Sequence, residues 1–116
     1  MRLKSEIWAK AYLRRCAGDG AMGAVVKRGD TDAGTIFIKI ARLDGTADLY
    51  GPAPSGYVDD ETNDGDRRWM VLAETKPEAD VDAMIERERR LDSDAWIIEI
   101  EDRQGRHFLN GWLAKG

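Results

Sequence analysis

Apolar residues recur every three or four positions near the start of the chain. Trp8, Tyr12 and Cys16 fall on one side of a helical wheel, and charged side chains occupy the opposite side. Gly18 follows this stretch, and glycine readily takes the left-handed conformation that ends many helices. The pattern predicts an amphipathic helix over residues 5–17 that stops at Gly18.

β-branched residues dominate the next part of the chain. The polar stretch 29–34 separates two such runs and suits a hairpin loop. Asp44-Gly45 is typical of a two-residue turn in which both residues have positive φ. We therefore expect a three-stranded meander in which the isoleucines of the middle strand line one fully buried face. The expected strands are 24–27, 35–40 and 47–50.

A strand, a helix and a strand are predicted in succession by residues 69–101. Two apolar runs, 69–74 and 95–101, flank a stretch in which Val81 and Ile85 begin an apolar helical face. Acidic residues stand near the start of this helix and arginines near its end, which suits the helix dipole.

The start of that helix has two candidate caps. Thr75 and Glu78 have the spacing of a capping box, with Pro77 in the first turn, and Asp80 is the alternative cap. Beyond the last long strand, a turn at 102–105 leads into a short partner strand at 106–109.

A chain of 116 residues with this pattern suits one domain with one hydrophobic core. We expect an α+β fold over residues 1–116 in the order α-β-β-β-β-α-β-β. The sheet is mixed and mainly antiparallel, and two helices cover it. If strands 69–74 and 95–101 are parallel neighbours, the helix between them is a right-handed crossover.

An acidic segment interrupts the pattern. Residues 59–66 contain no apolar side chain, so we expect a mobile loop at 57–67. The segment fails as a calcium-binding loop started at Asp60, because Val71 occupies the twelfth position, where a glutamate is required.

Charge and cysteine content exclude several classes of protein. The formal net charge is −4 and the 18 basic residues are interleaved with acids, which disfavours non-specific nucleic-acid binding. The single cysteine forms no internal disulfide, and no apolar run reaches the ~20 residues of a membrane span. We expect a protein of the reducing cytoplasm that does not bind membranes.

Glu74 and Lys76 provide the main enzymatic hypothesis. A Glu-x-Lys at a strand end, with upstream acids and Glu6, resembles the site of the PD-(D/E)xK nucleases, in which carboxylates hold Mg²⁺ and lysine activates water. The chain departs from that family because it has no Pro-Asp and four strands precede Glu74. The alternative is a solvated pair at a strand end.

Glu88 is a buried-charge candidate because it falls within the apolar face of the second helix. One interpretation is a structural ion pair with an arginine, and the other is a carboxylate with a raised pKa in a cleft.

Other catalytic and cofactor sites have little support. Cys16 and His107 are the sole residues of their kinds, and both suit structural roles better than a thiol-imidazole dyad. Zinc needs more Cys and His, and no glycine-rich loop has phosphate-binding spacing. We expect neither a metal nor another cofactor.

We therefore favour a non-enzymatic interaction or regulatory module with a protein partner. Its aromatic and arginine side chains are of the kinds enriched at interfaces. A metal-dependent hydrolase or nuclease of PD-(D/E)xK-like type is the alternative. The candidate binding residues are Tyr50, Pro52, Tyr57, Arg87, Arg90 and Trp112.

Several short runs together resemble one bacterial family, catalogued as domain of unknown function 1491. The resemblance covers nearly the whole chain and implies a small cytoplasmic protein of alphaproteobacterial type. It implies no activity, cofactor or catalytic residue. The runs are Leu3-Lys4-Ser5-Glu6-Ile7-Trp8, Leu13-Arg14-Arg15-Cys16, the loop from Gly29-Asp30 to Gly34, Leu49-Tyr50-Gly51-Pro52-Ala53, and the stretch from Glu86-Arg87-Glu88-Arg89-Arg90 to Glu101-Asp102.

Overall fold

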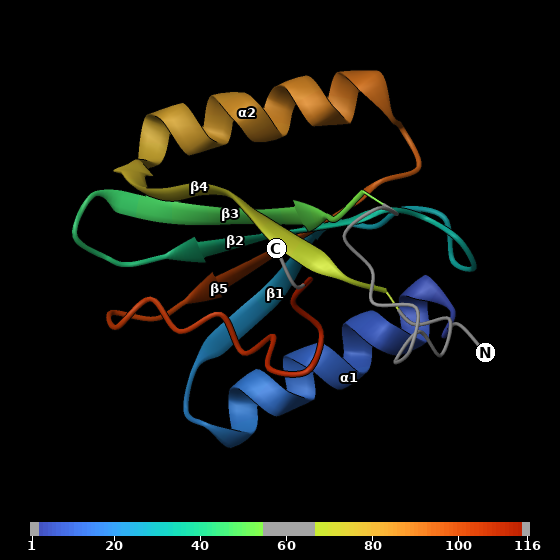
Figure 1. Ribbon diagram of the computed structural model, residues 1–116, viewed down its shortest axis with the longest axis horizontal. Helices are drawn as coiled ribbons and strands as arrows, with labels where there is room; N and C mark the ends of the chain where they lie inside the picture. The colour runs from blue at the N-terminus through green and yellow to red at the C-terminus, as the bar shows by residue number, and fades with distance from the viewer. Residues whose placement is uncertain (1–2, 55–66, 115–116) are drawn as a thin grey trace.

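Two helices enclose a five-stranded sheet in the computed structural model, which describes residues 3–54 and 67–114 (Figure 1). This confirms a single α+β domain with a mixed sheet and two helices. Tyr57 lies outside the described residues, as does the expected loop at 57–67 except for Arg67. The elements are α1 Ser5–Gly18, β1 Met22–Lys27, β2 Ile36–Ala41, β3 Thr46–Pro52, β4 Trp69–Pro77, α2 Glu78–Leu91 and β5 Trp96–Glu101.

The strand order is β1-β5-β2-β3-β4. Strand β5 runs parallel to β2 and antiparallel to β1, and β2, β3 and β4 form an antiparallel meander. The expected pairing of the first two strands is therefore wrong, because β5 lies between them. Strands β4 and β5 run in the same direction but are not neighbours, so α2 carries the chain from one edge of the meander past β3 and β2.

The loop between β1 and β2 explains why these strands do not form a hairpin. The backbone N–H of Asp30 donates to the carbonyl of Asp94 at 2.9 Å, and the Trp96 indole N–H donates to the Asp30 carbonyl at 2.7 Å. A Cβ atom at Gly29 would lie 2.0 Å from the Asp94 oxygen, and one at Gly34 would lie 2.5 Å from it. The loop thus packs against the entry to β5 and leaves room for that strand.

A buried core lies on each face of the sheet, not on one face alone. Ile38 and Ile98 belong to the core beneath α1, which also holds Trp8, Tyr12 and Trp69. The opposite face carries a second core, in which Phe37, Leu49 and Ile97 pack with the apolar face of α2. Figure 1 shows the sheet between the two helices, with α1 and the C-terminal segment on the same side.

Residues 106–109 do not form a strand, so the expected order contains one strand too many. Their backbone groups form hydrogen bonds with side chains instead of with the backbone of a neighbouring strand. The N–H of Arg106 donates to Asp102, the N–H of Leu109 donates to the His107 ring, and the His107 carbonyl accepts from the Tyr12 hydroxyl. Phe108 has φ +57°, which also breaks an extended conformation.

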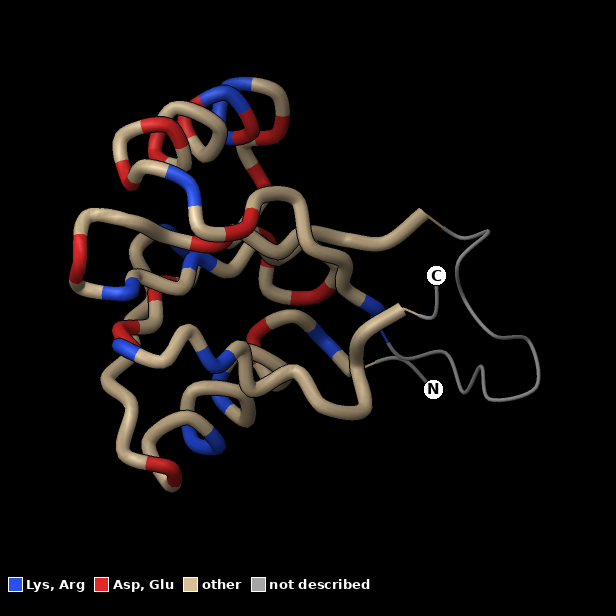
Figure 2. The backbone as a smooth tube through the Cα atoms, turned by 60° about the vertical axis from the view of Figure 1, so that its left-hand side comes forward, with Lys and Arg blue, Asp and Glu red and all other residues tan. Residues whose placement is uncertain are grey.

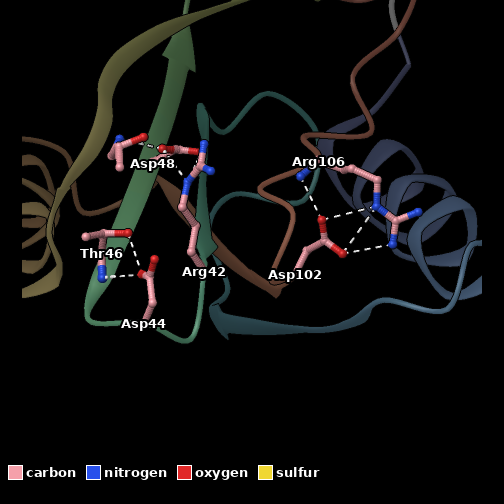
Figure 3. A network of polar contacts seen from close by, with 7 residues as sticks. Arg42, Asp44, Thr46, Asp48, Asp102 and Arg106 are labelled. Atoms are coloured by element: carbon pink, nitrogen blue, oxygen red, sulfur yellow. Dashed lines mark hydrogen bonds and ion pairs between the residues drawn. The ribbon is translucent and has the colours of Figure 1, made fainter.

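The β2–β3 hairpin is present, but its turn differs from the expected one. Positive φ falls on Leu43 (+64°) and Gly45 (+90°), not on Asp44. The N–H of Arg42 donates to the Thr46 carbonyl, so three residues form the loop. The Asp44 carboxylate accepts hydrogen bonds from both the backbone N–H and the hydroxyl of Thr46, and these two bonds stabilise the turn (Figure 3).

Neither expected cap is present at the start of α2. The helix begins after Pro77 without a side-chain cap, and the N–H of Glu78 donates to the Gly45 carbonyl. The Glu78 carboxylate bonds to Lys39 instead of reaching back along the helix. At the end of α1, Gly18 is still helical and Gly20 takes the positive φ, at +84°.

Candidate functional site

A cleft of about 450 Å³ lies on the α1 side of the sheet, between the edge strand β4 and the C-terminal segment. Backbone hydrogen bonds hold these two walls together at one end. The N–H of Trp69 donates to the Trp112 carbonyl at 2.9 Å, and the N–H of Ala114 donates to the Trp69 carbonyl at 2.8 Å. The lining residues are Tyr50, Trp69, Met70, Val71, Glu74, His107, Leu113 and Ala114.

A group of aromatic rings supports the cleft from below. Trp8 of α1 stacks on Trp69 with 4.1 Å between ring centroids and contacts Trp112 edge-on at 4.9 Å. The guanidinium of Arg15 lies 3.9 Å from the Trp112 ring centroid and donates to the carbonyl of Asn110. Trp112, one of the candidate binding residues, therefore packs the C-terminal wall against α1.

An irregularity in β4 determines which of its side chains face the cleft. Paired residues of adjacent strands share a face of the sheet, and Tyr50 pairs with Val71 whereas Ala47 pairs with Lys76. Tyr50 belongs to the core on the α1 side and Ala47 to the core beneath α2. Glu74 lines the cleft beside Tyr50, so Glu74 and Lys76 lie on opposite faces of the sheet.

Thr75 causes this reversal. Its φ is +50°, where a regular strand has a strongly negative value. The buried carboxylate of Asp48 accepts a 2.6 Å hydrogen bond from the Thr75 N–H and is itself held by the Arg42 guanidinium (Figure 3). Alternation along a regular strand would place Glu74 and Lys76 on the same face, and the left-handed residue between them removes that alternation.

The polar side chains that line the cleft are those of Tyr50, Glu74 and His107, and none of them is a permanent positive charge. The rings of Tyr50 and His107 meet edge-to-face at 5.5 Å. Burial raises the pKa of the Tyr50 phenol, and the negative charges of Asp48 and Glu74 raise it further. Burial lowers the pKa of His107, against a smaller opposing effect of Asp48. Since the Leu109 N–H donates to Nδ1 of this ring, the neutral imidazole carries its proton on Nε2.

A second polar cluster fixes the C-terminal wall. The Asp102 carboxylate accepts from the backbone N–H of Arg106 at 2.7 Å and from its guanidinium at 2.8 Å (Figure 3). These bonds with Arg106 hold the pKa of Asp102 below its ordinary range, against the effect of burial. The bent backbone that presents His107 to the cleft therefore starts from a rigid turn.

The structure separates most of the residues expected to act together. Arg87 and Arg90 are exposed on α2, across the sheet from the cleft that Tyr50 lines, and Pro52 is exposed at the end of β3. Glu6 lies 3.9 Å from Lys10 and bonds to Arg28, which follows β1 at the opposite edge of the sheet from Glu74 of β4. Among the described residues, the expected sites contribute Tyr50 and Glu74 to the cleft.

Glu88 is half-buried, and no ion pair of the described residues includes it. The buried charge of this face is Lys39 on β2, whose side chain is 5% exposed. Its ammonium lies 2.7 Å from both Glu78 and Asp82 and 3.5 Å from Glu99. Burial opposes the charge, but these carboxylates outweigh it and raise the pKa of Lys39. The sequence indicated this buried lysine only by its place between Ile38 and Ile40, which puts its side chain on the other face of the strand.

Cys16 and His107 belong to different surroundings. Burial raises the pKa of the Cys16 thiol, which suppresses the thiolate that nucleophilic chemistry needs. His107 lines the cleft, a position that its pattern in the sequence did not indicate. Within residues 3–54 and 67–114, no group of three or more His, Cys, Asp or Glu side chains is arranged to hold a metal ion.

The family model described as "Protein of unknown function (DUF1491)" matches residues 3–110. The chain belongs to the DUF1491 family. A crystal structure of a DUF1491 protein from Caulobacter crescentus CB15 is 38% identical, covers all of both chains and has a TM-score of 0.79. The solution structure of Atu0922 from A. tumefaciens is 43% identical, with 87% of this chain and 86% of that chain covered and a TM-score of 0.74.

A second structure of a Caulobacter crescentus CB15 DUF1491 protein, determined by NMR, is 41% identical over 93% of each chain, with a TM-score of 0.74. The expected membership of this family is thus confirmed, with bacterial relatives. No curated protein matches the chain. Neither helix of the described chain has the length and apolar character needed to cross a bilayer.

Proposed function

We propose that this DUF1491 protein is a small non-enzymatic binding module that receives a segment of a protein partner in the cleft between β4 and the C-terminal segment. The observation that carries the proposal is the composition of this cleft. Its walls are mainly apolar and aromatic, and its few polar groups come from three separate parts of the chain. Concave sites of this composition are typical of ligand and peptide binding.

Exposed apolar side chains at the cleft rim support a macromolecular ligand. Val71 is 43% exposed on β4 and Leu113 is 37% exposed on the facing segment. Strand β4 is the last in the sheet order and pairs with a single neighbouring strand. The neutral Tyr50 phenol donates hydrogen bonds and the Glu74 carboxylate accepts them, so an extended segment meets both apolar and polar contacts there.

A metal-dependent hydrolase is the second candidate. Its strongest support was the Glu-x-Lys spacing, and the placement of Glu74 and Lys76 on opposite faces of the sheet weighs against it. The arrangement of charges also favours a protein partner over nucleic acid, because acidic and basic positions are mixed along the described backbone (Figure 2). A cytoplasmic location belongs to the same proposal and rests on the single, buried cysteine.

Selection of binding peptides from a random displayed library, followed by amide NMR mapping on the labelled protein, tests the proposal. We expect saturable shifts at Val71, Glu74 and Leu113, and loss of binding in Val71→Lys. The matched control is Leu91→Lys, which adds the same charge at a residue 75% exposed on α2 and should bind normally. Peptides that shift only residues elsewhere would refute the cleft, and concerted Mg²⁺-induced shifts at Glu74 and Lys76 would favour the hydrolase.

A further inference from the structure

The edge of the sheet opposite the cleft carries a second exposed apolar surface. Strand β1 ends the sheet order on that side and pairs with β5 alone. Met22 is 74% exposed and Val26 is 55% exposed. Helix α2 packs on β2, β3 and β4, so it lies over the far end of the sheet from β1 (Figure 1). An unprotected strand of this kind is a template for pairing with another strand.

The side chains beside this edge form a hollow of about 200 Å³ with an acidic floor. Ala24 pairs with Glu99 and Met22 pairs with Glu101, so these four side chains share the α2 face of the sheet. Glu99 lies 3.5 Å from the Lys39 ammonium, but that single positive charge is shared with Glu78 and Asp82. The cluster of three carboxylates and one lysine therefore has an excess of negative charge.

We propose that the β1 edge, Met22 to Val26, binds an extended segment of a basic partner protein as an added strand. The charge of the floor determines the kind of segment. A strand added to β1 would lie ~10 Å from β5, which is within the combined reach of a Lys or Arg and a Glu side chain. Ala24 is small and leaves the path to Glu99 open, so a basic residue opposite Ala24 reaches that carboxylate.

The residues on either side of that basic residue meet apolar surface. In an extended segment, the residues two before and two after the basic residue share its face of the sheet. These two residues lie over Met22 and Val26. The ladder of β1 is regular from Met22 to Val25 and shifts register before Lys27, which limits pairing to this short length. The fitting sequence is therefore a short strand that places Lys or Arg between apolar residues on one face.

A second copy of the chain fits this edge less well. Each copy carries a formal charge of −4, and a short strand edge buries far less than the ~1,200 Å² of a stable interface. A basic segment gains from the acidic floor, whereas another acidic copy does not.

The test uses two blocked octapeptides, one alternating Lys with Val and one alternating Glu with Val, titrated into the labelled full chain. We expect the Lys peptide to shift the amides of Met22 to Val26 and of Glu99 to Glu101, with binding that weakens as salt is raised. The Glu peptide should bind at least about tenfold more weakly. Equal binding of both peptides, no binding, or shifts confined to other residues would overturn the proposal.

Three variants and one control separate the charge effect from folding. Glu101→Gln keeps the Lys39 cluster intact and should weaken the Lys peptide about threefold, and Glu99→Gln with Glu101→Gln should weaken it about tenfold. Ala24→Lys places the chain's own ammonium over Glu99 and should abolish binding, with amide shifts changed only around residues 24 and 99. Asp80→Asn is the charge control on the exposed surface of α2 and should bind normally.

Sedimentation tests the alternative occupant, a second copy of the chain. A concentration-dependent dimer that is lost in Ala24→Lys would assign the edge to a second copy and refute the basic partner.

Discussion

The buried carboxylate of Asp48 accepts a 2.6 Å hydrogen bond from the backbone N–H of Thr75, a residue with φ +50°. This contact stabilises a conformation that a β-branched residue rarely adopts. It also sets the orientation of both neighbours, because Glu74 lines the cleft and Lys76 lies on the other face. The ion pair between Asp48 and Arg42 thus supports the local geometry of the proposed binding site.

Asp48→Ala should lower the free energy of unfolding by about 3 kcal/mol, because it leaves the Arg42 guanidinium without its buried partner and the Thr75 N–H without an acceptor. Chemical denaturation measures the change. Asp44→Ala is the control, since the exposed Asp44 bonds only within its own turn, and its cost should be about 1 kcal/mol or less. Equal costs for the two variants would contradict this role of Asp48.

Thr75→Gly should leave stability unchanged or raise it by up to about 1 kcal/mol. A left-handed conformation costs a β-branched residue ~1–2 kcal/mol, which exceeds the entropic cost of ~0.5–1 kcal/mol for introducing glycine. Thr35→Gly, at a threonine outside the positive-φ region, should destabilise by ~0.5–1 kcal/mol. Thermal unfolding compares the two, and a larger loss for Thr75→Gly would show that Thr75 is not strained.

Lys39→Ala should cost about 3 kcal/mol, because it leaves Glu78, Asp82 and Glu99 close together without their shared ammonium. Lys39→Met leaves the same carboxylates without the ammonium but fills the buried volume of the lysine stem, so its cost should be smaller. Lys10→Ala removes a surface ion pair with Glu6 and should change stability by less than ~0.5 kcal/mol. Denaturant midpoints that do not follow this order would refute a stabilising role for the cluster.

The imidazole of His107 should titrate below its ordinary pKa of 6.5 in the folded protein, because burial disfavours its charged form. The unfolded chain therefore binds this proton first as the pH falls. The contribution of His107 to stability is fully present above the unfolded pKa and is lost as the pH falls toward the lower folded pKa. NMR titration of the ring protons measures the folded value directly.

His107→Asn is the control for that titration, because an asparagine oxygen accepts from the Leu109 N–H much as Nδ1 does. The loss of stability between pH 7 and pH 5.5 should be smaller in this variant than in the parent chain. A folded pKa at or above 6.5 would show that the ring is not desolvated by the cleft.

Local patterns in the sequence predicted most elements but not how they assemble. The helix α1 and the strands β2, β4 and β5 were each evident, because apolar periodicity depends on which side of one element is buried. The expected strand at 106–109 failed because its backbone partners, Asp102, Tyr12 and the ring of His107, are side chains that no periodic pattern records.

The candidate site was only partly predictable for the same reason. Tyr50 and Glu74 were identified from residue type and strand position. His107 and Leu113 came to the cleft through a bent C-terminal segment, opposite Val71 of β4. A regular strand would place both side chains of the Glu-x-Lys motif on one face. The Asp48 carboxylate, distant in sequence, stabilises the left-handed Thr75 that separates them.

The sequence by itself determined the α+β class, the two helices and the apolar strands, because each follows from the local burial and conformational preferences of neighbouring residues. Only the tertiary structure decided that β5 enters between β1 and β2, that a buried core lies on each face of the sheet, and that β1 and β4 remain as edges. Strand order depends on contacts between residues far apart in the chain, such as Asp30 with Asp94, and such contacts leave no periodic trace in a single sequence.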